Sequence, residues 1–216
     1  MIALNDACMA ITKGDCKAAI VGGTSLHLSP ATVTSLSEAG VFSPDGSSKT
    51  FSANANGFAR GEGIVAIYVK SLDDAIRDGN AIRAVISGIS TNFDGKTATM
   101  GRPYAPTQEA NIRRAYEVAG ISDIWRTGLF ECHGTGTAAG DPVEAEALAA
   151  VFGEKGIHIS SLKPNLGHSE GAAGVSGVCG FFPPLIPSFK TCIRIKQITT
   201  MGRSNSVPFY PLILGV

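Results

Sequence analysis

Charge is scarce in this sequence, and neither sign is in excess. Charged residues make up 17% of the 216 residues, and 18 basic side chains balance 18 acidic ones. A chain without a basic surplus does not favour nucleic acid or an anionic surface as a partner. Apolar runs of membrane-spanning length are also missing, because glycines and prolines interrupt the longest candidate. We therefore expect a soluble globular protein with no membrane partner.

Cysteine spacing typical of metal sites is absent as well. The five cysteines are scattered along the chain, and we recognise no signal peptide. These absences favour reduced thiols in a cytoplasmic protein and predict no bound metal.

Glycine is abundant, with 26 residues, and it gathers around two of the four histidines. The apolar run 127–130 predicts a short buried strand that ends at His133. The glycines that follow let the backbone approach a ligand closely. Asp141 then predicts a helix N-cap, with Pro142 in the first helical position and Glu144 completing a capping box. The order is strand, histidine-bearing loop and helix.

The second histidine, His168, lies in a similar setting. Residues 157–159 predict a short strand, residues 163–165 a turn, and residues 171–174 the small-residue start of a helix. The helix dipole disfavours a protonated imidazole near its N-terminus, so we expect a neutral, hydrogen-bond-donating ring. Loops after strands meet at one edge of an open α/β sheet, where ligands bind. The pair of histidines therefore predicts a functional site.

Helices and strands alternate along the rest of the chain. We expect helices at residues 2–13, 30–40, 72–77 and 106–119, and strands at residues 18–23, 64–69 and 81–90. The strands are almost continuously apolar, which is typical of an α/β sheet buried on both faces. Spacing also suggests two ion pairs, Lys163 with Glu170 and Arg60 with Glu62.

Four stretches together resemble a known family. Residues 131–144, ECHGTGTAAGDPVE, are similar to the E-A-H-G-T-G-T-x-x-G-D-P-x-E signature of β-ketoacyl synthases. Residues 163–171 resemble their K-x-N-[IL]-G-H-x-E-[GA] signature, and residues 51–63 their F-D-x-x-A-x-G-[YF]-x-R-G-E-G signature. Residues 92–97 are similar to the N-x-D-G-[KR]-T of type I polyketide synthases. The resemblance covers residues 1 to about 178.

This resemblance implies an incomplete thiolase-like fold with layers of helices and sheets. Residues 1–178 would be a partial ketosynthase domain, holding the end of the first half of the fold and part of the second. Residues 179–216 resemble nothing in the family, and we interpret them as an aberrant tail from intron read-through or a frameshift. By the family's register, the nucleophilic cysteine would lie about four residues before Met1. We expect Cys8 and Cys16 to be small buried residues and not nucleophiles. Cys132 and His133 are neighbours on a strand and point to opposite faces, so they cannot form a thiolate–imidazole pair.

The resemblance also assigns roles in a decarboxylative Claisen condensation. His133 and His168 would stabilise the enolate formed from a malonyl thioester. Thr135 and Thr137 would hold the pantetheine amides, and Phe58 would help to gate acyl entry. Side chains that support the second histidine loop would be Lys163, Asn165 and Glu170. Acyl and malonyl groups would arrive on the phosphopantetheine of an acyl carrier protein; the domain would bind no cofactor of its own and would be a homodimer in the full-length enzyme.

Other functions are also compatible with these residues. A fatty-acid β-ketoacyl synthase shares the signatures, although residues 92–97 favour a polyketide synthase. A truncated piece that binds acyl or pantetheine groups without turnover is a further alternative. The spacing of Gly134, Gly136 and Gly140 has one residue too many for a dinucleotide loop. A metal site built on Asp141 and Glu144 is disfavoured because helix capping already accounts for both.

Overall fold

The computed structural model describes residues 1–97, 102–180 and 211–215. The elements in chain order are α1 (Ile2–Lys13), β1 (Ala18–Ser25), α2 (Pro30–Glu38), β2 (Gly63–Lys70), α3 (Leu72–Arg77), β3 (Val85–Ser90), α4 (Ala105–Val118), η1 (Ile124–Arg126), β4 (Phe130–Glu131), α5 (Asp141–Phe152), η2 (Gly153–Lys155), β5 (Ile159–Ser160), α6 (Lys163–Leu166), η3 (Glu170–Ala172), α7 (Ala173–Gly180) and β6 (Pro211–Gly215). The predicted alternation of helices and strands is confirmed.

Local sequence signals determine where several of these elements begin and end. Helix α1 stops at Gly14, whose φ of 83° lets its N–H bond back to the carbonyl oxygens of Ala10 and Ile11. Helix α3 begins after Ser71, whose hydroxyl accepts a hydrogen bond from the N–H of Asp74. Strand β3 begins at Val85, four residues later than predicted.

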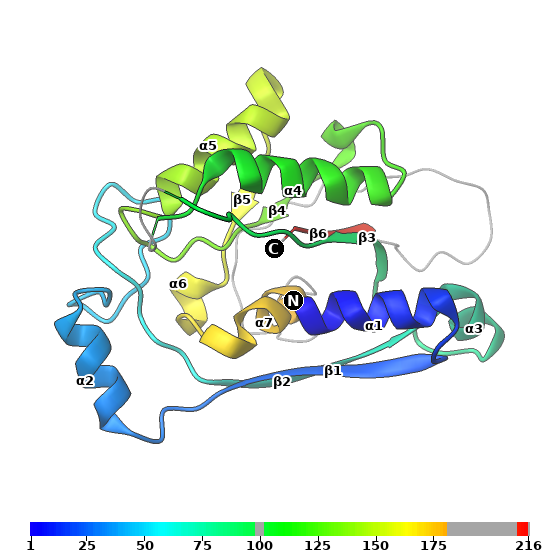
Figure 1. Cartoon of the computed structure of the whole chain (residues 1–216), viewed down its shortest axis with the longest axis horizontal. Coiled ribbons are helices and arrows are strands. Elements are labelled where there is room, and N and C mark those ends of the chain that lie inside the picture. The colour runs from blue at the N-terminus through cyan, green and yellow to red at the C-terminus, as the bar shows by residue number, and fades with distance from the viewer. Residues whose placement is uncertain (98–101, 181–210, 216) are drawn as a thin grey trace.

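The chain forms alternating layers of strands and helices (Figure 1). Strands β1 and β2 pair antiparallel over their full length, and α1 and α7 pack on the same side of this pair. Strand β3, paired in parallel with β6, forms the next layer; α4 covers its far side, and α5 packs against α4. This layered α/β arrangement is the one that the family resemblance implies.

The expectation of strands covered on both faces is wrong for β1 and β2. Side chains on one face of this pair are largely exposed, with 76% of Ile20, 73% of Ile64 and 64% of Tyr68 accessible to solvent. Helices α1 and α7 bury only the opposite face, and none of the residues that the structure describes covers these three side chains. Periodicity alone could not reveal this, because both faces carry apolar residues.

The main apolar cluster fixes the position of the first histidine. It lies between α4, α5 and β4, and its buried members are Ile112, Tyr116, Cys132, Leu148, Val151 and Phe152. Strand β4 pairs in parallel with β5, and the N–H of Cys132 extends the ladder to the carbonyl oxygen of Ser160 at 2.7 Å. With Cys132 directed into this core, its neighbour His133 is directed out of it.

The tail predicted from residue 179 onward lies mostly outside the described residues. Its segment Pro211–Gly215 forms β6 beside β3, whereas residues 181–210 and Val216 are not described. The boundary at residue 178 stays a prediction.

Candidate active site

Two carboxylates from α5 hold the first histidine loop, residues 132–140. Glu144 accepts hydrogen bonds from the backbone N–H groups of His133 at 2.6 Å and Gly134 at 2.8 Å. Asp141 accepts from the N–H groups of Gly136 at 3.1 Å and Thr137 at 3.4 Å. The predicted capping box is therefore wrong. The helix begins at Asp141 with no side-chain cap, and both carboxylates are used to shape the loop before it.

Backbone contacts from a distant segment hold the second histidine loop, residues 161–170. The N–H of His168 donates to the carbonyl oxygen of Ala59 at 2.7 Å, and the N–H of Gly61 donates to that of His168 at 2.9 Å. Gly167 has φ of 75°, and a Cβ there would lie 2.7 Å from the carbonyl oxygen of Arg60. Residues 163–165, predicted as a turn, belong to the single-turn helix α6.

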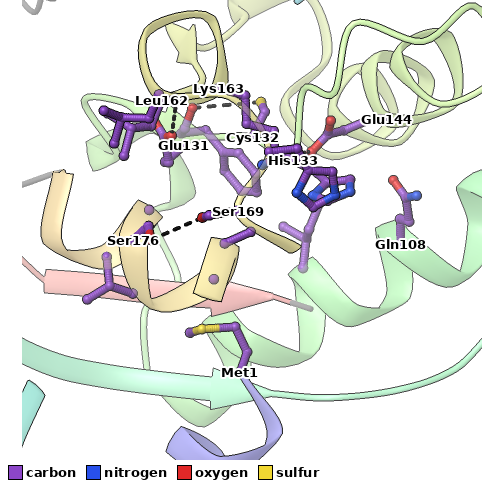
Figure 2. A pocket seen from close by; sticks show the side chains of 18 of the residues that line it. Met1, Gln108, Glu131, Cys132, His133, Glu144, Leu162, Lys163, Ser169 and Ser176 are labelled. Carbon is purple, nitrogen blue, oxygen red and sulfur yellow. Dashed lines mark hydrogen bonds between the residues drawn. The ribbon is translucent and has the colours of Figure 1, made fainter. Parts of the chain in front are cut away.

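The two loops bring the histidine side chains together. The ring centroids of His133 and His168 are 5.2 Å apart and the rings are nearly perpendicular, at 88°. Both line a cavity of about 530 Å³, to which Lys163 and Met1 also contribute. Figure 2 shows Met1 reaching this cavity from the amino end of α1, opposite the loop that carries His133. One pocket thus combines the two imidazoles with the start of the first helix.

Hydrogen bonding determines the tautomer of His168. Its Nδ1 accepts the backbone N–H of Glu170 at 3.0 Å, so the proton of the neutral ring lies on Nε2. Burial, followed by the charge of Lys163, lowers the pKa of His168. Burial, then Lys163 and then His168, lowers the pKa of His133 to about 3. His133 is nevertheless exposed at the cavity mouth, where water moderates the shift without changing its direction. Both rings are therefore neutral near pH 7.

A cluster of buried charge lies beneath the histidines. Lys163 is 8% exposed, and burial lowers its pKa while Glu131 and Glu144 oppose that effect. Burial raises the pKa of each of these two carboxyl groups. The Glu131 carboxylate accepts the N–H of Leu162 at 2.6 Å, which links the end of β4, just before the first histidine loop, to the second loop.

Both predicted ion pairs are wrong. Glu170 pairs with Arg60, not with Lys163, at 2.8 Å between Oε2 and Nη2. Glu62, expected to pair with Arg60, instead accepts the backbone N–H of His27 at 2.6 Å. Spacing along the chain cannot identify partners that come from different loops.

The other predicted site residues, Phe58, Thr135, Thr137 and Asn165, do not line the cavity. Phe58 packs edge-on against His168, with 5.1 Å between ring centroids, and lies behind it, outside the cavity lining. The hydroxyls of Thr135 and Thr137 bond to each other at 2.9 Å within the first loop. Asn165 is exposed on α6. These three polar residues also lie outside the cavity lining.

Sequence reasoning gave no site role to the polar residues of α4. Gln108 and Asn111 line the same cavity, and Figure 2 shows Gln108 across from His133. Asn111 is only 3% exposed although it adjoins the apolar residue Ile112. A buried amide on the apolar stripe of a helix is the signal that could have indicated this contribution.

Of the described cysteines, Cys132 lines the cavity. Burial, with the nearby carboxylates of Glu144 and Glu131, raises the pKa of its thiol. A nucleophilic cysteine requires a lowered pKa, whereas the pKa of Cys132 is raised. The described part of the chain contains no group of three or more histidine, cysteine or acidic side chains arranged to hold a metal ion, and no described helix is long and apolar enough to cross a membrane.

Sequence profiles of one family match most of the chain. Residues 1–75 match the beta-ketoacyl synthase N-terminal domain, and residues 83–182 match the beta-ketoacyl synthase C-terminal domain. The chain belongs to the β-ketoacyl synthase family. This β-ketoacyl synthase chain is 57% identical over 175 residues to the highly reducing polyketide synthase sphB of Aspergillus fumigatus, and 54% identical over 176 residues to the highly reducing polyketide synthase g433 of a Fusarium species.

The matches cover 81% and 82% of the chain but only 7% of each synthase, so the chain spans a small part of these relatives. Among solved structures, it is similar to the ketosynthase from module 6 of the bacillaene synthase of Bacillus subtilis 168, with a TM-score of 0.80 and 42% identity. That match covers 84% of this chain and 33% of the ketosynthase. The oxazolomycin ketosynthase domain OzmH KS7 of Streptomyces albus matches with a TM-score of 0.79 and 33% identity, covering 84% of this chain and 32% of that domain. These likenesses confirm the predicted thiolase-like fold.

Proposed function

We propose that this chain is part of the ketosynthase domain of a highly reducing polyketide synthase and takes part in decarboxylative Claisen condensation. In this reaction a malonyl thioester loses carbon dioxide, and the resulting enolate attacks an acyl-cysteine thioester. The new carbon–carbon bond gives a β-ketoacyl thioester, and the cysteine thiolate leaves. The relatives named above are polyketide synthases, which favours this function over fatty-acid synthesis.

The observation that carries the proposal is the meeting of two neutral imidazoles in one cavity, 5.2 Å apart. Loss of carbon dioxide places negative charge on the malonyl thioester oxygen, and a preorganised N–H donor stabilises that charge. His168 offers its Nε2–H, because its Nδ1 is already occupied by the N–H of Glu170. His133, neutral and open to the cavity, supplies the second donor.

The amino end of α1 supports the position of the nucleophile. Met1 lines the cavity, so a cysteine shortly before it would face both histidines. A thiolate at that end would be stabilised by the helix dipole, which lowers a cysteine pKa. The raised pKa of the Cys132 thiol argues against Cys132 as the nucleophile.

The remaining assignments complete the proposal. Acyl and malonyl groups reach the cavity on the phosphopantetheine of an acyl carrier protein, with Thr135 and Thr137 holding its amides. Phe58, in contact with His168, gates the acyl group. Asn165 supports the second loop from its exposed side. The full-length enzyme would act as a cytoplasmic homodimer that binds no metal or cofactor of its own.

Release of carbon dioxide from malonyl-carrier protein tests the proposal directly. We expect His133→Gln and His168→Gln each to slow release by roughly 100- to 1000-fold. The matched control is His158→Gln, because His158 is exposed and its side chain lies outside the cavity. Equal rates for all three variants would overturn the role of the histidine pair. Tight pantetheine binding with no carbon dioxide release would instead favour the non-catalytic alternative.

A further inference from the structure

Glu170 has an unusual backbone conformation. Among the described non-glycine residues, only Glu170, with φ of 39°, and Phe51 have a positive φ. This left-handed region is disfavoured for residues with a side chain and persists only where surrounding contacts impose it. In this conformation the N–H of Glu170 donates to Nδ1 of His168 at 3.0 Å. Whatever holds Glu170 in place therefore also determines the tautomer of His168.

The side chain of Glu170 is held by Arg60. Nη2 of Arg60 lies 2.8 Å from Oε2 of Glu170, and only 11% of the Arg60 side chain is exposed. The guanidinium carbon lies 5.9 Å from the centre of the Phe42 ring, which limits access of water on that side. The Arg60 charge is shielded from water while 34% of the Glu170 side chain is exposed, so the pair is stronger than one between two fully exposed surface charges.

Arg60 is itself fixed against the second histidine loop. Its neighbours Ala59 and Gly61 bond to the backbone of His168 at 2.7 and 2.9 Å. The guanidinium therefore reaches Glu170 from a backbone position that is already fixed relative to His168. This geometry differs from that of an arginine on a mobile surface segment, where an ion pair could form without constraining the loop.

We propose that Arg60 is a positioning residue for His168. Its ion pair with Glu170 holds the backbone N–H of Glu170 on Nδ1, and this contact keeps the ring proton on Nε2, where it faces the cavity. The catalytic consequence rests on the proposed function, whereas the effect on the tautomer does not.

The charges around His168 determine the sign of the expected change. Lys163 from α6 lowers the pKa of His168, Glu170 raises it, and His133 and Arg60 are the other ionisable neighbours. An N–H bonded to Nδ1 favours the neutral ring, so loss of this bond raises the pKa. Removal of Arg60 also leaves the Glu170 charge uncompensated, which acts in the same direction. We therefore expect Arg60→Ala to raise the pKa of His168.

Nitrogen NMR of the full chain labelled in histidine tests this inference without relying on activity. The His168 signals are assigned by their loss in His168→Gln. In the unmodified chain we expect Nδ1 without a proton and Nε2 with one. Arg60→Ala should produce a mixture of tautomers and a higher pKa, and Arg60→Lys should recover part of the original state. The matched control is Arg114→Ala, because Arg114 forms an exposed ion pair with Glu117 on α4.

A second variant separates backbone geometry from folding defects. Glycine adopts positive φ without steric cost. If the backbone conformation of Glu170 is what matters, Glu170→Gly should keep more of the Nε2–H tautomer than Glu170→Ala.

Where the chain is active, carbon dioxide release should fall by up to roughly 100-fold in Arg60→Ala, together with the change of tautomer. An unchanged tautomer and pKa of His168 in both Arg60 variants would overturn the inference, even if carbon dioxide release is observed.

Discussion

The two histidine loops present similar rings but are supported in different ways. The first loop is held by Asp141 and Glu144, which belong to the helix that directly follows it. The second is held by the segment Ala59–Gly61, more than 100 residues away along the chain, and by the Arg60–Glu170 ion pair. The first loop therefore takes its charged support from the helix that follows it, although Thr50 and Gly57 also bond to it, whereas the second takes its charged support from a distant segment. Substitutions of the carboxylates in the first loop should disturb the geometry of that loop. Substitutions in the second should disturb the docking of the segment Ala59–Gly61 against it.

The largest expected effect is on the first loop, in Asp141→Ala. Asp141 is 4% exposed and accepts the N–H groups of Phe51, Gly136 and Thr137. Its removal leaves buried donors without partners, so we expect the free energy of unfolding to fall by about 3 to 4 kcal/mol. Urea denaturation measures this. The exposed Glu146 on the same helix is the control, and a loss in Asp141→Ala no larger than in Glu146→Ala would show that the loop does not depend on α5.

Glu144→Ala should have a somewhat smaller effect on stability and a specific effect on His133. It removes two charged hydrogen bonds, to the N–H groups of His133 and Gly134, and should lower the free energy of unfolding by about 2 to 3 kcal/mol. Because these bonds orient the histidine, carbon dioxide release should fall even under conditions where the variant is fully folded. Undiminished carbon dioxide release by folded Glu144→Ala would contradict the role of Glu144 in orienting His133.

Gly61→Ala tests the second loop. A Cβ at this position would lie 2.1 Å from the carbonyl oxygen of Leu166, so the two segments would have to separate. Crowding of this kind typically costs about 1 to 3 kcal/mol, and we expect the free energy of unfolding to fall by about 2 kcal/mol. Gly128→Ala is the matched control, since nothing lies within 4 Å of its added Cβ. Equal stability of these two variants would show that the close approach is not required.

The same difference explains what the sequence could predict. The bounds of α1 and α3, the alternation of elements and the meeting of His133 with His168 follow from local patterns and from the rule that strand ends share an edge. Sequence patterns predict Glu144 as part of a capping box, because capping is the explanation that the neighbouring residues offer. The partner of Glu170 could not be predicted, since Arg60 lies 110 residues away and only the folded chain brings them together.

The smallest expected effect is the contribution of His168 to the pH dependence of stability. Burial and Lys163 lower the pKa of His168 in the folded chain, so the unfolded chain binds its proton first as pH falls below the ordinary value of about 6.5. Stability from this group is therefore lost as pH falls from that value toward the folded pKa. The pKa values of Glu131 and Glu144 are raised, and their protonation acts in the opposite direction, so the difference between variants is the useful quantity.

We expect the unmodified chain to lose stability relative to His168→Gln between about pH 7.5 and about pH 5.5. The loss at the lower pH cannot exceed about 1.4 kcal/mol, and solvent around the half-buried ring makes it smaller. Urea denaturation of both chains across this range measures the difference. A difference that stays constant, or that grows in favour of the unmodified chain as pH falls, would mean that His168 is not held in its neutral form by the fold. The shape of the second loop would then have no electrostatic consequence for the ring that it carries.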